Sequence, residues 1–381
     1  MFKILKEMEK FLAGTFISKG TYKSFEPSKI NRNWEVQEMG LLNLLSKADR
    51  QLGRLDMFSE YIPNINLFIS MHIVKEATQS SKIEGTKTNI EEALLDKEDV
   101  KEEKKNDWEE VQNYIQALNT AIEDLEDLPF STRLIKATHK TLLKGVRGAH
   151  KQPGEFRKSQ NWIGGASIQD ATFIPPHFSL INEYMSDMEK FAHNEDILLP
   201  DLLKVALIHY QFETIHPFLD GNGRVGRLLV TLYLVEKGIL KKPILYLSDF
   251  FERNRQLYYD NLTKVRQNHD INQWFKFFLV GILETSKKSS DTFDSILKLQ
   301  KDVEIQIQTL GNRAINAQLI INSLYENPML TVSRAQKIIN QSLPSTYKLI
   351  SDLEKLKILT EISGSKRGKL YLFKQYLDLF R

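Results

Sequence analysis

The stretch that decides the fold and the function is His216-Pro217-Phe218-Leu219-Asp220-Gly221-Asn222-Gly223-Arg224-Val225-Gly226-Arg227. A strong helix is predicted over 200–214, just before it, and another over 223–237. Between them, Gly-Asn-Gly permits positive φ angles, which turn consecutive N–H groups toward one point. The following helix adds unpaired N–H groups and the positive end of its dipole. The pattern therefore predicts an anion site suited to a polyphosphate.

The charged side chains of this stretch fit the same chemistry. Arg224 and Arg227 are three residues apart and so lie on neighbouring faces of the first helical turn. Asp220 offers a hard oxygen ligand where Mg²⁺ could bridge phosphates, and His216 can accept a proton at neutral pH. A glycine turn or a histidine after a helix is often only structural. Because all these groups fall within twelve residues, we interpret them as one functional site.

These twelve residues match the signature HPFxDGNGRxxR and so resemble the Fic family, whose members move a nucleotide monophosphate, usually AMP from ATP, onto a protein hydroxyl. The resemblance implies a mainly α fold with a short β-hairpin flap, ATP as substrate and Mg²⁺ at Asp220. It implies that His216 is the catalytic base. The nucleotide-binding residues that it implies are Asp220, Gly221, Asn222, Gly223, Arg224, Val225, Gly226 and Arg227.

The resemblance extends outward to a flap and an adenine pocket. A hairpin is predicted over 162–176, between a Gly-rich approach and the Pro175-Pro176 return. By resemblance, the flap would hold the target protein beside its strand edge. The flap residues expected to do this are Ile163, Gly164, Thr172, Phe173 and Ile174. Tyr258 and Tyr259 resemble the segment that lines the adenine pocket.

A second motif, Ser80-Ser81-Lys82-Ile83-Glu84-Gly85, follows a helix predicted over 66–83. It matches the family pattern [S/T]xxxE[G/N] of an inhibitory helix at Ser80, Glu84 and Gly85. Alone, an acidic residue before a helix-ending glycine is usually a surface charge. Beside a complete active-site motif, we expect Glu84 to pair with Arg227 and occupy the guanidinium that should bind the γ-phosphate of ATP.

The rest of the chain divides by composition and helical pattern. We predict an N-terminal helical extension over 1–108, a Fic catalytic domain over 109–290, a linker helix over 291–311 and a winged helix-turn-helix over 312–381. Within them, helices are predicted over 32–62, 108–126, 131–144, 179–193, 249–266 and 271–309. The charge run over 97–107 is interpreted as a solvated connector.

The C-terminal 70 residues leave a second class of function open. Three helices (314–326, 332–340 and 344–357) precede two strand-like runs, 359–362 and 369–373, which is the order of a winged helix. Lys366, Arg367 and Lys369 in the predicted wing could contact DNA phosphates, but the recognition helix offers little base-reading charge. The alternatives are therefore a nucleotide-sensing DNA-binding regulator, or a module for protein interaction or dimerisation. A third alternative keeps the fold and removes AMP or transfers another phosphoryl group.

Composition sets outer limits on these interpretations. The 381 residues carry a net charge of only +3, which excludes a strong overall nucleic-acid or membrane field. With no cysteine, a disulfide framework, a thiolate metal site and a cysteine nucleophile are excluded. We expect a cytoplasmic protein without signal peptide or membrane span. Its expected partners are target proteins with Ser, Thr or Tyr hydroxyls, itself included, with a homodimer left open.

Overall fold

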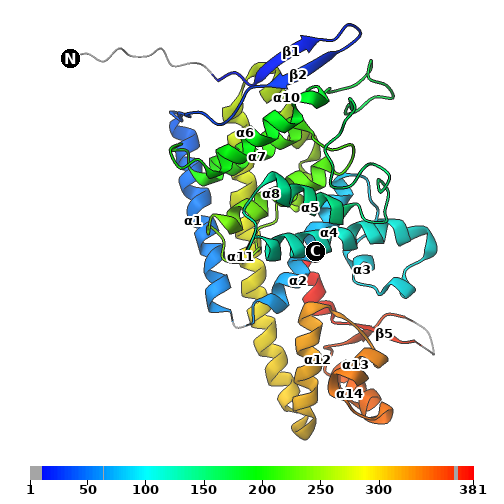
Figure 1. Cartoon of the computed structure of the whole chain (residues 1–381). Coiled ribbons are helices and arrows are strands. Elements are labelled where there is room, and N and C mark those ends of the chain that lie inside the picture. The colour runs from blue at the N-terminus through cyan, green and yellow to red at the C-terminus, as the bar shows by residue number, and fades with distance from the viewer. Residues whose placement is uncertain (1–10, 63, 364–367) are drawn as a thin grey trace.

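Two long helices, α1 (Met39–Tyr61) and α11 (Ile271–Gln308), lie side by side along one edge of the molecule (Figure 1). The computed structural model describes residues 11–62, 64–363 and 368–381, and they are mainly helical, as predicted. The helix predicted over 32–62 begins only at Met39, because its apolar stripe starts at Leu41. That stripe packs on α11, which runs for 38 residues, about 57 Å.

The catalytic region is a bundle around one fully enclosed helix. In α7 (Asp201–Ile215) every residue from Leu202 onward is buried, so this helix forms the centre of the core. The other helices of this bundle are α4 (Lys105–Asp124), α5 (Thr132–Leu142), α6 (Ile181–His193), preceded by η3 (Phe178–Leu180), α8 (Asn222–Glu236) and α10 (Arg255–Asn268). Helices α6, α8 and α11 pack directly on α7. The helix predicted over 249–266 is in fact two, because α9 (Ser248–Arg253) ends at Asn254 before α10 begins.

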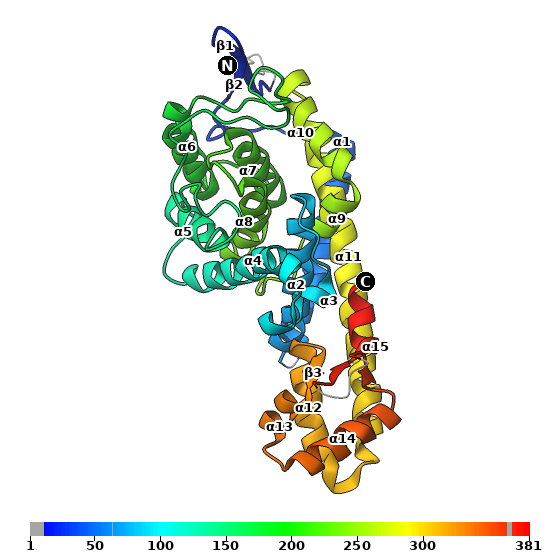
Figure 2. The same cartoon turned by 90° about the vertical axis from the view of Figure 1, so that its right-hand side faces the viewer.

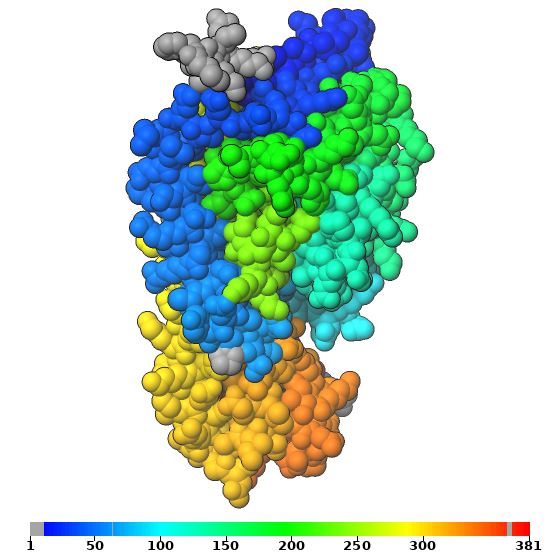
Figure 3. All heavy atoms as spheres, turned by 60° about the vertical axis from the view of Figure 1, so that its left-hand side comes forward, coloured from blue at the N-terminus to red at the C-terminus, as the bar shows by residue number. Residues whose placement is uncertain are grey.

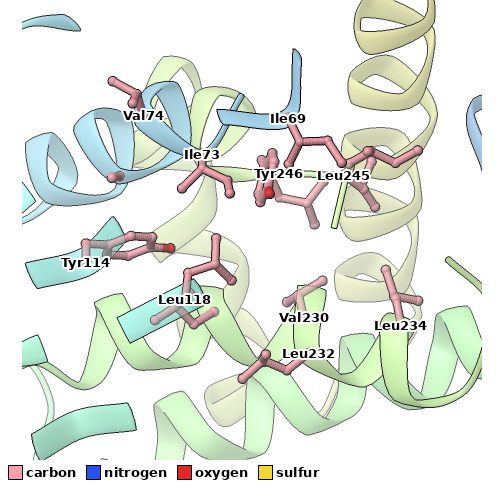
Figure 4. Close-up of a cluster of buried hydrophobic side chains, with 14 of the residues drawn as sticks. Ile69, Ile73, Val74, Tyr114, Leu118, Val230, Leu232, Leu234, Leu245 and Tyr246 are labelled. Carbon is pink, nitrogen blue, oxygen red and sulfur yellow. The ribbon is translucent and has the colours of Figure 1, made fainter. Parts of the chain in front are cut away.

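Helix α2 (Asn66–Ile83) has the predicted bounds and packs between the bundle and the C-terminal elements. In Figure 4, Ile73 of α2 lies above Leu118 of α4 and Val230 of α8. The charge run over 97–107 contains two short helical turns, η1 (Lys97–Asp99) and η2 (Glu102–Lys104), after α3 (Ile90–Ala93). Helix α4 begins at Lys105, three residues earlier than predicted.

The N-terminal extension is not helical throughout. Strands β1 (Gly14–Ser18) and β2 (Lys23–Pro27) form an antiparallel hairpin at one end of the molecule, with Phe16 opposite Phe25. The backbone N–H of Phe25 donates to the carbonyl of Ile174 at 2.9 Å, so this hairpin joins the predicted flap. The flap itself forms only one bridge, Ile163 to Phe173, instead of the hairpin predicted over 162–176.

The C-terminal region packs beneath the bundle as a separate lobe (Figure 3). Its elements are η4 (Gly311–Arg313), α12 (Ala314–Glu326), β3 (Met329–Thr331), α13 (Val332–Ile339), α14 (Leu343–Lys355), β4 (Thr360–Glu361), β5 (Leu370–Leu372), α15 (Lys374–Leu377) and η5 (Asp378–Phe380). The strands form an antiparallel sheet in the order β3-β5-β4, so a strand at 329–331 joins the two that were predicted. The wing cations Lys366 and Arg367 lie outside the described residues.

This lobe contacts the helix that carries the second motif. Helix α12 packs on α2, where the rings of Phe68 and Tyr325 meet edge to face at 5.1 Å. At the other end of the lobe, the ring of Phe380 lies 5.0 Å from that of His72. Among the described residues, no helix is both long and apolar enough to cross a membrane.

Candidate active site

The glycine-rich loop between α7 and α8 is closed by its own side chains. Helix α7 ends at His216, which takes the left-handed conformation with φ 48°. The Asn222 side chain then accepts from the N–H of Phe218 and donates to its carbonyl, both at 2.8 Å. Gly221 precedes α8 with φ 75°, a conformation that glycine adopts without strain. These hydrogen bonds fix the loop. The first N–H groups of α8, which follow it, have no acceptor within the helix.

Two residues outside the motif clamp this loop. Arg157, 2% exposed, donates from Nε to the carbonyl of His216 at 3.0 Å. His139 stacks on Phe218 with ring centroids 3.7 Å apart, and its Nε2 lies 3.0 Å from the carbonyl of Asp220. Because its Nδ1 accepts from the N–H of Gly154 at 2.8 Å, Nε2 is the donor. This role of His139 could not be predicted from the sequence, because its partners, Gly154 and Asp220, lie on two other loops.

Asp220 lies at the mouth of the loop. Its Oδ1 accepts from the N–H of Gly221 at 2.6 Å, and its side chain is 37% exposed. Nη2 of Arg224 is 3.7 Å away. The described residues hold no group of three or more metal-ligating side chains. One accessible carboxylate nevertheless fits Mg²⁺ of the kind that takes most of its ligands from water and substrate phosphates.

Arg227 is held by the second motif, as expected. Its Nη2 donates to Oε1 of Glu84 at 2.7 Å and to the carbonyl of Ser80 at 2.9 Å. Its Nε donates to the hydroxyl of Ser80 at 2.8 Å. Arg227 is almost fully buried, whereas the Glu84 side chain is 32% exposed. The structure thus brings Ser80, Glu84 and Arg227 together beside the glycine loop, while Gly85, with φ 97°, ends the helix.

The carboxylate of Glu84 keeps its negative charge in this pair. Burial pushes its pKa upward, but the charge and hydrogen bond of Arg227 outweigh burial and hold the pKa below its usual range. Glu213 has no ion-pair partner in the part of the chain that the structure describes, and burial raises its pKa to about 7. The Glu213 carboxyl lies so close to Gly226 that a Cβ at position 226 would overlap its Oε1. Glu213 is a site-flanking acid that sequence reasoning missed, because α7 reads as a plain core helix.

Arg224 belongs to a second buried network. Its Nη1 lies 3.4 Å from Oε2 of Glu110, which is 1% exposed and also accepts from the hydroxyl of Thr86 at 2.9 Å. Nε of Arg147 is 3.3 Å from the other oxygen of Glu110. Glu110 therefore connects the loop after Glu84 with the first turn of α8. From the sequence, Glu110 is predicted only as part of a helix, so its contacts with Thr86 and Arg224 were not predicted.

His216 is in the state that a proton acceptor requires. Burial lowers its pKa, and the nearby charges of Arg157 and Arg266 lower it further. The imidazole is therefore neutral at pH 7. Its Nδ1 is buried without a hydrogen-bond partner among the described residues.

The other predicted residues fall into two groups. Val225 and Gly226 face the core: the Val225 side chain is fully buried, and the carbonyl of Gly226 lies 2.8 Å from Nδ1 of His209. Tyr258 is also buried, with its hydroxyl 2.8 Å from Nε2 of His209. Tyr259, 38% exposed, lies beside it, with ring centroids 5.1 Å apart. Only Tyr259 of these is open to a ligand.

The flap residues are placed by the single bridge described above. The N–H of Ile163 donates to the carbonyl of Phe173 at 2.8 Å, and that of Thr172 donates to Ile163 at 2.9 Å. Gly164, with φ 69°, packs against the Thr172 hydroxyl so closely that a Cβ would overlap it. Arg266 lies 3.8 Å above the ring of Phe173. The flap is thus anchored to the core at its return.

Known families match two parts of the chain. The Fic/DOC family N-terminal region matches residues 42–123, and the Fic/DOC family itself matches residues 129–234. A probable protein adenylyltransferase of Aquifex aeolicus is 31% identical over 207 residues, which cover 51% of this chain and 56% of that protein. The protein adenylyltransferase Fic of Aedes aegypti is 33% identical over 125 residues, 32% of this chain and 22% of that protein. The chain therefore spans between a fifth and about half of these relatives.

Solved structures show the same fold. A Fic family protein from Desulfovibrio desulfuricans G20 superposes with a TM-score of 0.58 at 18% identity, covering 90% of this chain and 98% of that one. A Fic domain containing signaling protein from Bacteroides thetaiotaomicron VPI-5482 gives 0.50 at 18% identity, over 66% of this chain and 95% of that one.

Proposed function

We propose that this chain, which carries Fic N-terminal and Fic domains, is a protein adenylyltransferase that is inhibited by its own Glu84. It would transfer AMP from ATP to Ser, Thr or Tyr hydroxyls of target proteins and of itself. The observation that carries the proposal is the closed glycine loop, which places a neutral His216 shortly before the N-terminus of α8 with its free N–H groups.

The reaction is an in-line displacement at the α-phosphorus of ATP. His216 takes the proton of the target hydroxyl as its oxygen forms the new P–O bond, and the bond to pyrophosphate breaks. The N–H groups of Asn222 and Gly223, together with that of Gly221 once it leaves Asp220, would stabilise the negative charge that develops on the nonbridging oxygens. The hydrogen bonds of Asn222 with Phe218, and the contacts of Arg157 and His139, set the positions of these N–H groups before the substrate binds. Little reorganisation is therefore needed.

Asp220 is the residue that would hold Mg²⁺. The bound ion would neutralise charge on the α- and β-phosphates. Arg227 would hold the γ-phosphate, and Arg224, fixed by Glu110, would support the loop or the β-phosphate. Tyr259 is the exposed aromatic ring best placed for the adenine. The strand edge at Ile163 and Phe173 would position the target backbone.

Inhibition follows from competition for Arg227. The Glu84 carboxylate occupies the guanidinium, and the two bonds to Ser80 fix the guanidinium plane toward α2. ATP could then bind only with its γ-phosphate displaced, which would move the α-phosphate out of line with His216. The enzyme as folded is therefore expected to be a slow transferase.

Transfer of label tests the proposal. The purified protein is incubated with α-³²P-ATP and Mg²⁺, alone and with a lysate, and protein-bound label is followed over time. Label in this chain or in discrete lysate proteins, absent with γ-labelled ATP, supports AMP transfer. Label from the γ-position instead would identify a phosphotransferase. Loss of label from premodified targets, without any gain from ATP, would identify AMP removal.

The DNA-binding alternative gains no support from the wing. Lys369 pairs with Glu361 at 2.6 Å, which takes up one of the three predicted cations. On α14, Asp352 accepts from Arg313. DNA binding and dimerisation stay predictions.

A further inference from the structure

A second cavity, of about 740 Å³, lies at the seam between α2 and the C-terminal residues. Its walls come from the second half of α2, α9, α11 and the chain end at Phe380 and Arg381. They also include residues 85–91, called loop 85–91 below, which comprise the loop after Glu84 and the first two residues of α3. Figure 2 shows α15 and the chain end beside α11, on the side of α2 and α3. Its volume is in the range of small-molecule sites. It shares no lining residue with the glycine loop.

The walls of this seam cavity carry an excess of positive charge. Two carboxylates, Glu91 and Asp249, are outnumbered by six cationic side chains: Lys75, Lys82, Lys87, Arg253, Lys288 and Arg381. Lys82 and Arg381 also pair with acidic residues outside it. The remaining excess of cationic side chains lies around the carboxylate of Asp249. This one carboxylate lies 2.9 Å from Nζ of Lys288 and 3.4 Å from Nε of Arg253.

Lys75 adds a third cation to this cluster. Among the described residues, no carboxylate oxygen lies within 4 Å of its ammonium, although it is only partly exposed. Burial lowers the pKa of Lys75 to about 8, against the attraction of Asp249, and Lys288 and Arg253 lower it further. Three cations on three helices thus share a single carboxylate. An incoming anion would relieve their mutual repulsion.

Polar atoms without partners complete the wall. The hydroxyl of Thr88, a residue 4% exposed, makes no hydrogen bond among the described residues, and neither does Oε1 of Gln79. Both residues line the cavity. Once a side-chain rotation turns them toward the cavity, the Thr88 hydroxyl could donate to a phosphate oxygen and the Gln79 amide oxygen could accept from a ligand hydroxyl. Lysines, as mobile point charges, suit a phosphate approached from several sides.

The cavity also touches the parts that set inhibition. Thr88 follows Glu84 by four residues, and Lys75 lies on the helix that ends at Glu84. The same loop is tied to the active site through Thr86 and Glu110. A ligand that bridged α2 and loop 85–91 to α9 and α11 would hold α2 against the bundle, with Glu84 on Arg227.

We propose that the seam cavity binds a small phosphorylated molecule with hydroxyl groups, and that its occupancy strengthens inhibition by Glu84. The phosphate would lie among Lys75, Lys288 and Thr88. The binding half of the proposal stands on its own, whereas the regulatory half rests on the proposed function.

Pyridoxal 5′-phosphate is a direct probe of binding, because its aldehyde condenses with a neutral lysine and borohydride fixes the product. The full-length protein is treated briefly and the modified lysines are mapped by mass spectrometry. We expect Lys75 to be labelled at least tenfold faster by pyridoxal 5′-phosphate than by pyridoxal, which lacks the phosphate. Exposed Lys298, on the same helix as Lys288, serves as the control and should show no such preference.

Inorganic phosphate should protect Lys75, whereas chloride at equal ionic strength should not. Thr88→Val keeps the shape of the side chain but removes its hydroxyl, and should weaken the protection by phosphate several-fold. Equal labelling of Lys75 by the two aldehydes, or labelling that phosphate does not reduce, would overturn the site. Neither measurement depends on AMP transfer, so the site can be judged even if the proposed function fails.

Amide hydrogen exchange tests the regulatory half. In protein modified at Lys75, exchange over residues 84–89 should slow several-fold relative to Lys75→Gln protein treated in the same way. Label transfer from ATP by the modified protein should fall, and this fall should vanish in Glu84→Gly. Unchanged exchange over 84–89 in a protein shown to carry the modification would overturn the coupling to Glu84.

Discussion

Gly223 and Glu84 face each other with no room for a methyl group between them. An ideal Cβ on Gly223 would overlap Oε1 of Glu84 and lie 3.1 Å from Nη1 of Arg227. The Glu84 carboxylate therefore lies directly against the backbone that, under the proposed function, would cradle the phosphates. In this arrangement Glu84 and the triphosphate would compete for the same volume as well as for the same guanidinium.

Removal of the Glu84 carboxylate should activate the enzyme. Glu84→Gly frees Arg227, and a charge-assisted hydrogen bond contributes about 1.5–3 kcal/mol, so we expect a rise of about 10- to 100-fold in AMP transfer. Initial rates of label incorporation at saturating ATP measure it. Glu84→Gln should give a smaller rise, because its amide oxygen still accepts from Arg227. No gain in Glu84→Gly, or a gain that survives in Glu84→Gly/Arg227→Ala, would contradict the assignment.

A methyl group at position 223 should separate steric from electrostatic effects. Gly223→Ala would push Glu84 off Arg227 but also fill the space of a phosphate, so we expect loss of transfer in both the wild-type and Glu84→Gly backgrounds. Gly53→Ala, in open space on α1, is the matched control and should be neutral or slightly stabilising. If Gly223→Ala instead activated the wild type as Glu84→Gly does, the phosphates would have to bind elsewhere.

Replacement of His216 should remove catalysis and leave the fold. Because residue 216 is left-handed, with φ 48°, His216→Asn is a better test than alanine, since asparagine tolerates this conformation. We expect a drop of about 10²–10⁴-fold in the Glu84→Gly background, with ATP binding retained. Transfer rates and the thermal unfolding midpoint are measured together. Undiminished transfer by a folded His216→Asn protein would exclude His216 as the base.

The pH profile should lack the step of an ordinary histidine. The lowered pKa of His216 keeps its protonation away from neutral pH, so it should add no step to the rate. Burial raises the pKa of Glu213 to about 7, so both proteins are compared in a Glu213→Gln background that removes this titration. In that background the Glu84→Gly rate should stay flat from about pH 6 to 8. The depressed pKa of Glu84 means that its pair with Arg227 is complete above the usual glutamate range and is lost only as pH falls below it. The ratio of Glu84→Gly to wild-type rates should therefore also be constant over pH 6–8. A break near pH 6.5 in either quantity would contradict these assignments.

Glu110 should matter for stability as well as for activity. Glu110→Gln leaves the buried guanidinium of Arg224 without its carboxylate, and loss of one partner of a buried pair costs about 3–5 kcal/mol. Urea unfolding measures the change. Arg147→Gln touches the same carboxylate from the surface, where its side chain is 58% exposed, and should cost less than about 1 kcal/mol. Similar losses for both variants would show that the pair with Arg224 does not stabilise the fold.

Local patterns were sufficient to predict most of the helices and the central loop. Helix α2 has the predicted bounds because its apolar residues recur at helical spacing until Gly85. The expected meeting of Glu84 with Arg227 is also observed, but it came from family resemblance rather than from spacing. The contacts of His139 and Glu110 could not be predicted, since they join segments 81 and 114 residues apart that only the fold brings together.

The N-terminal hairpin was missed for a different reason. Phe16, Ile17, Tyr22 and Phe25 surround Gly20 in a pattern that favours a hairpin, but two five-residue strands are a weak signal beside long helices. The flap shows the opposite error. Its turn residues predicted a hairpin, whereas anchoring by Arg266 and by Phe25 of β2 leaves only one bridge within it.

Because α11 is one continuous helix, it fixes the orientation of the C-terminal lobe about the helix axis relative to the catalytic bundle. Each residue of an α-helix advances its direction by about 100°. Adding or deleting one residue near Lys298 would therefore swing the whole C-terminal lobe around the helix axis. Tyr325 and Phe380 would then turn away from Phe68 and His72. Only insertions or deletions close to a whole number of helical turns would preserve these contacts. The length of α11 is therefore constrained in proteins that keep the same packing.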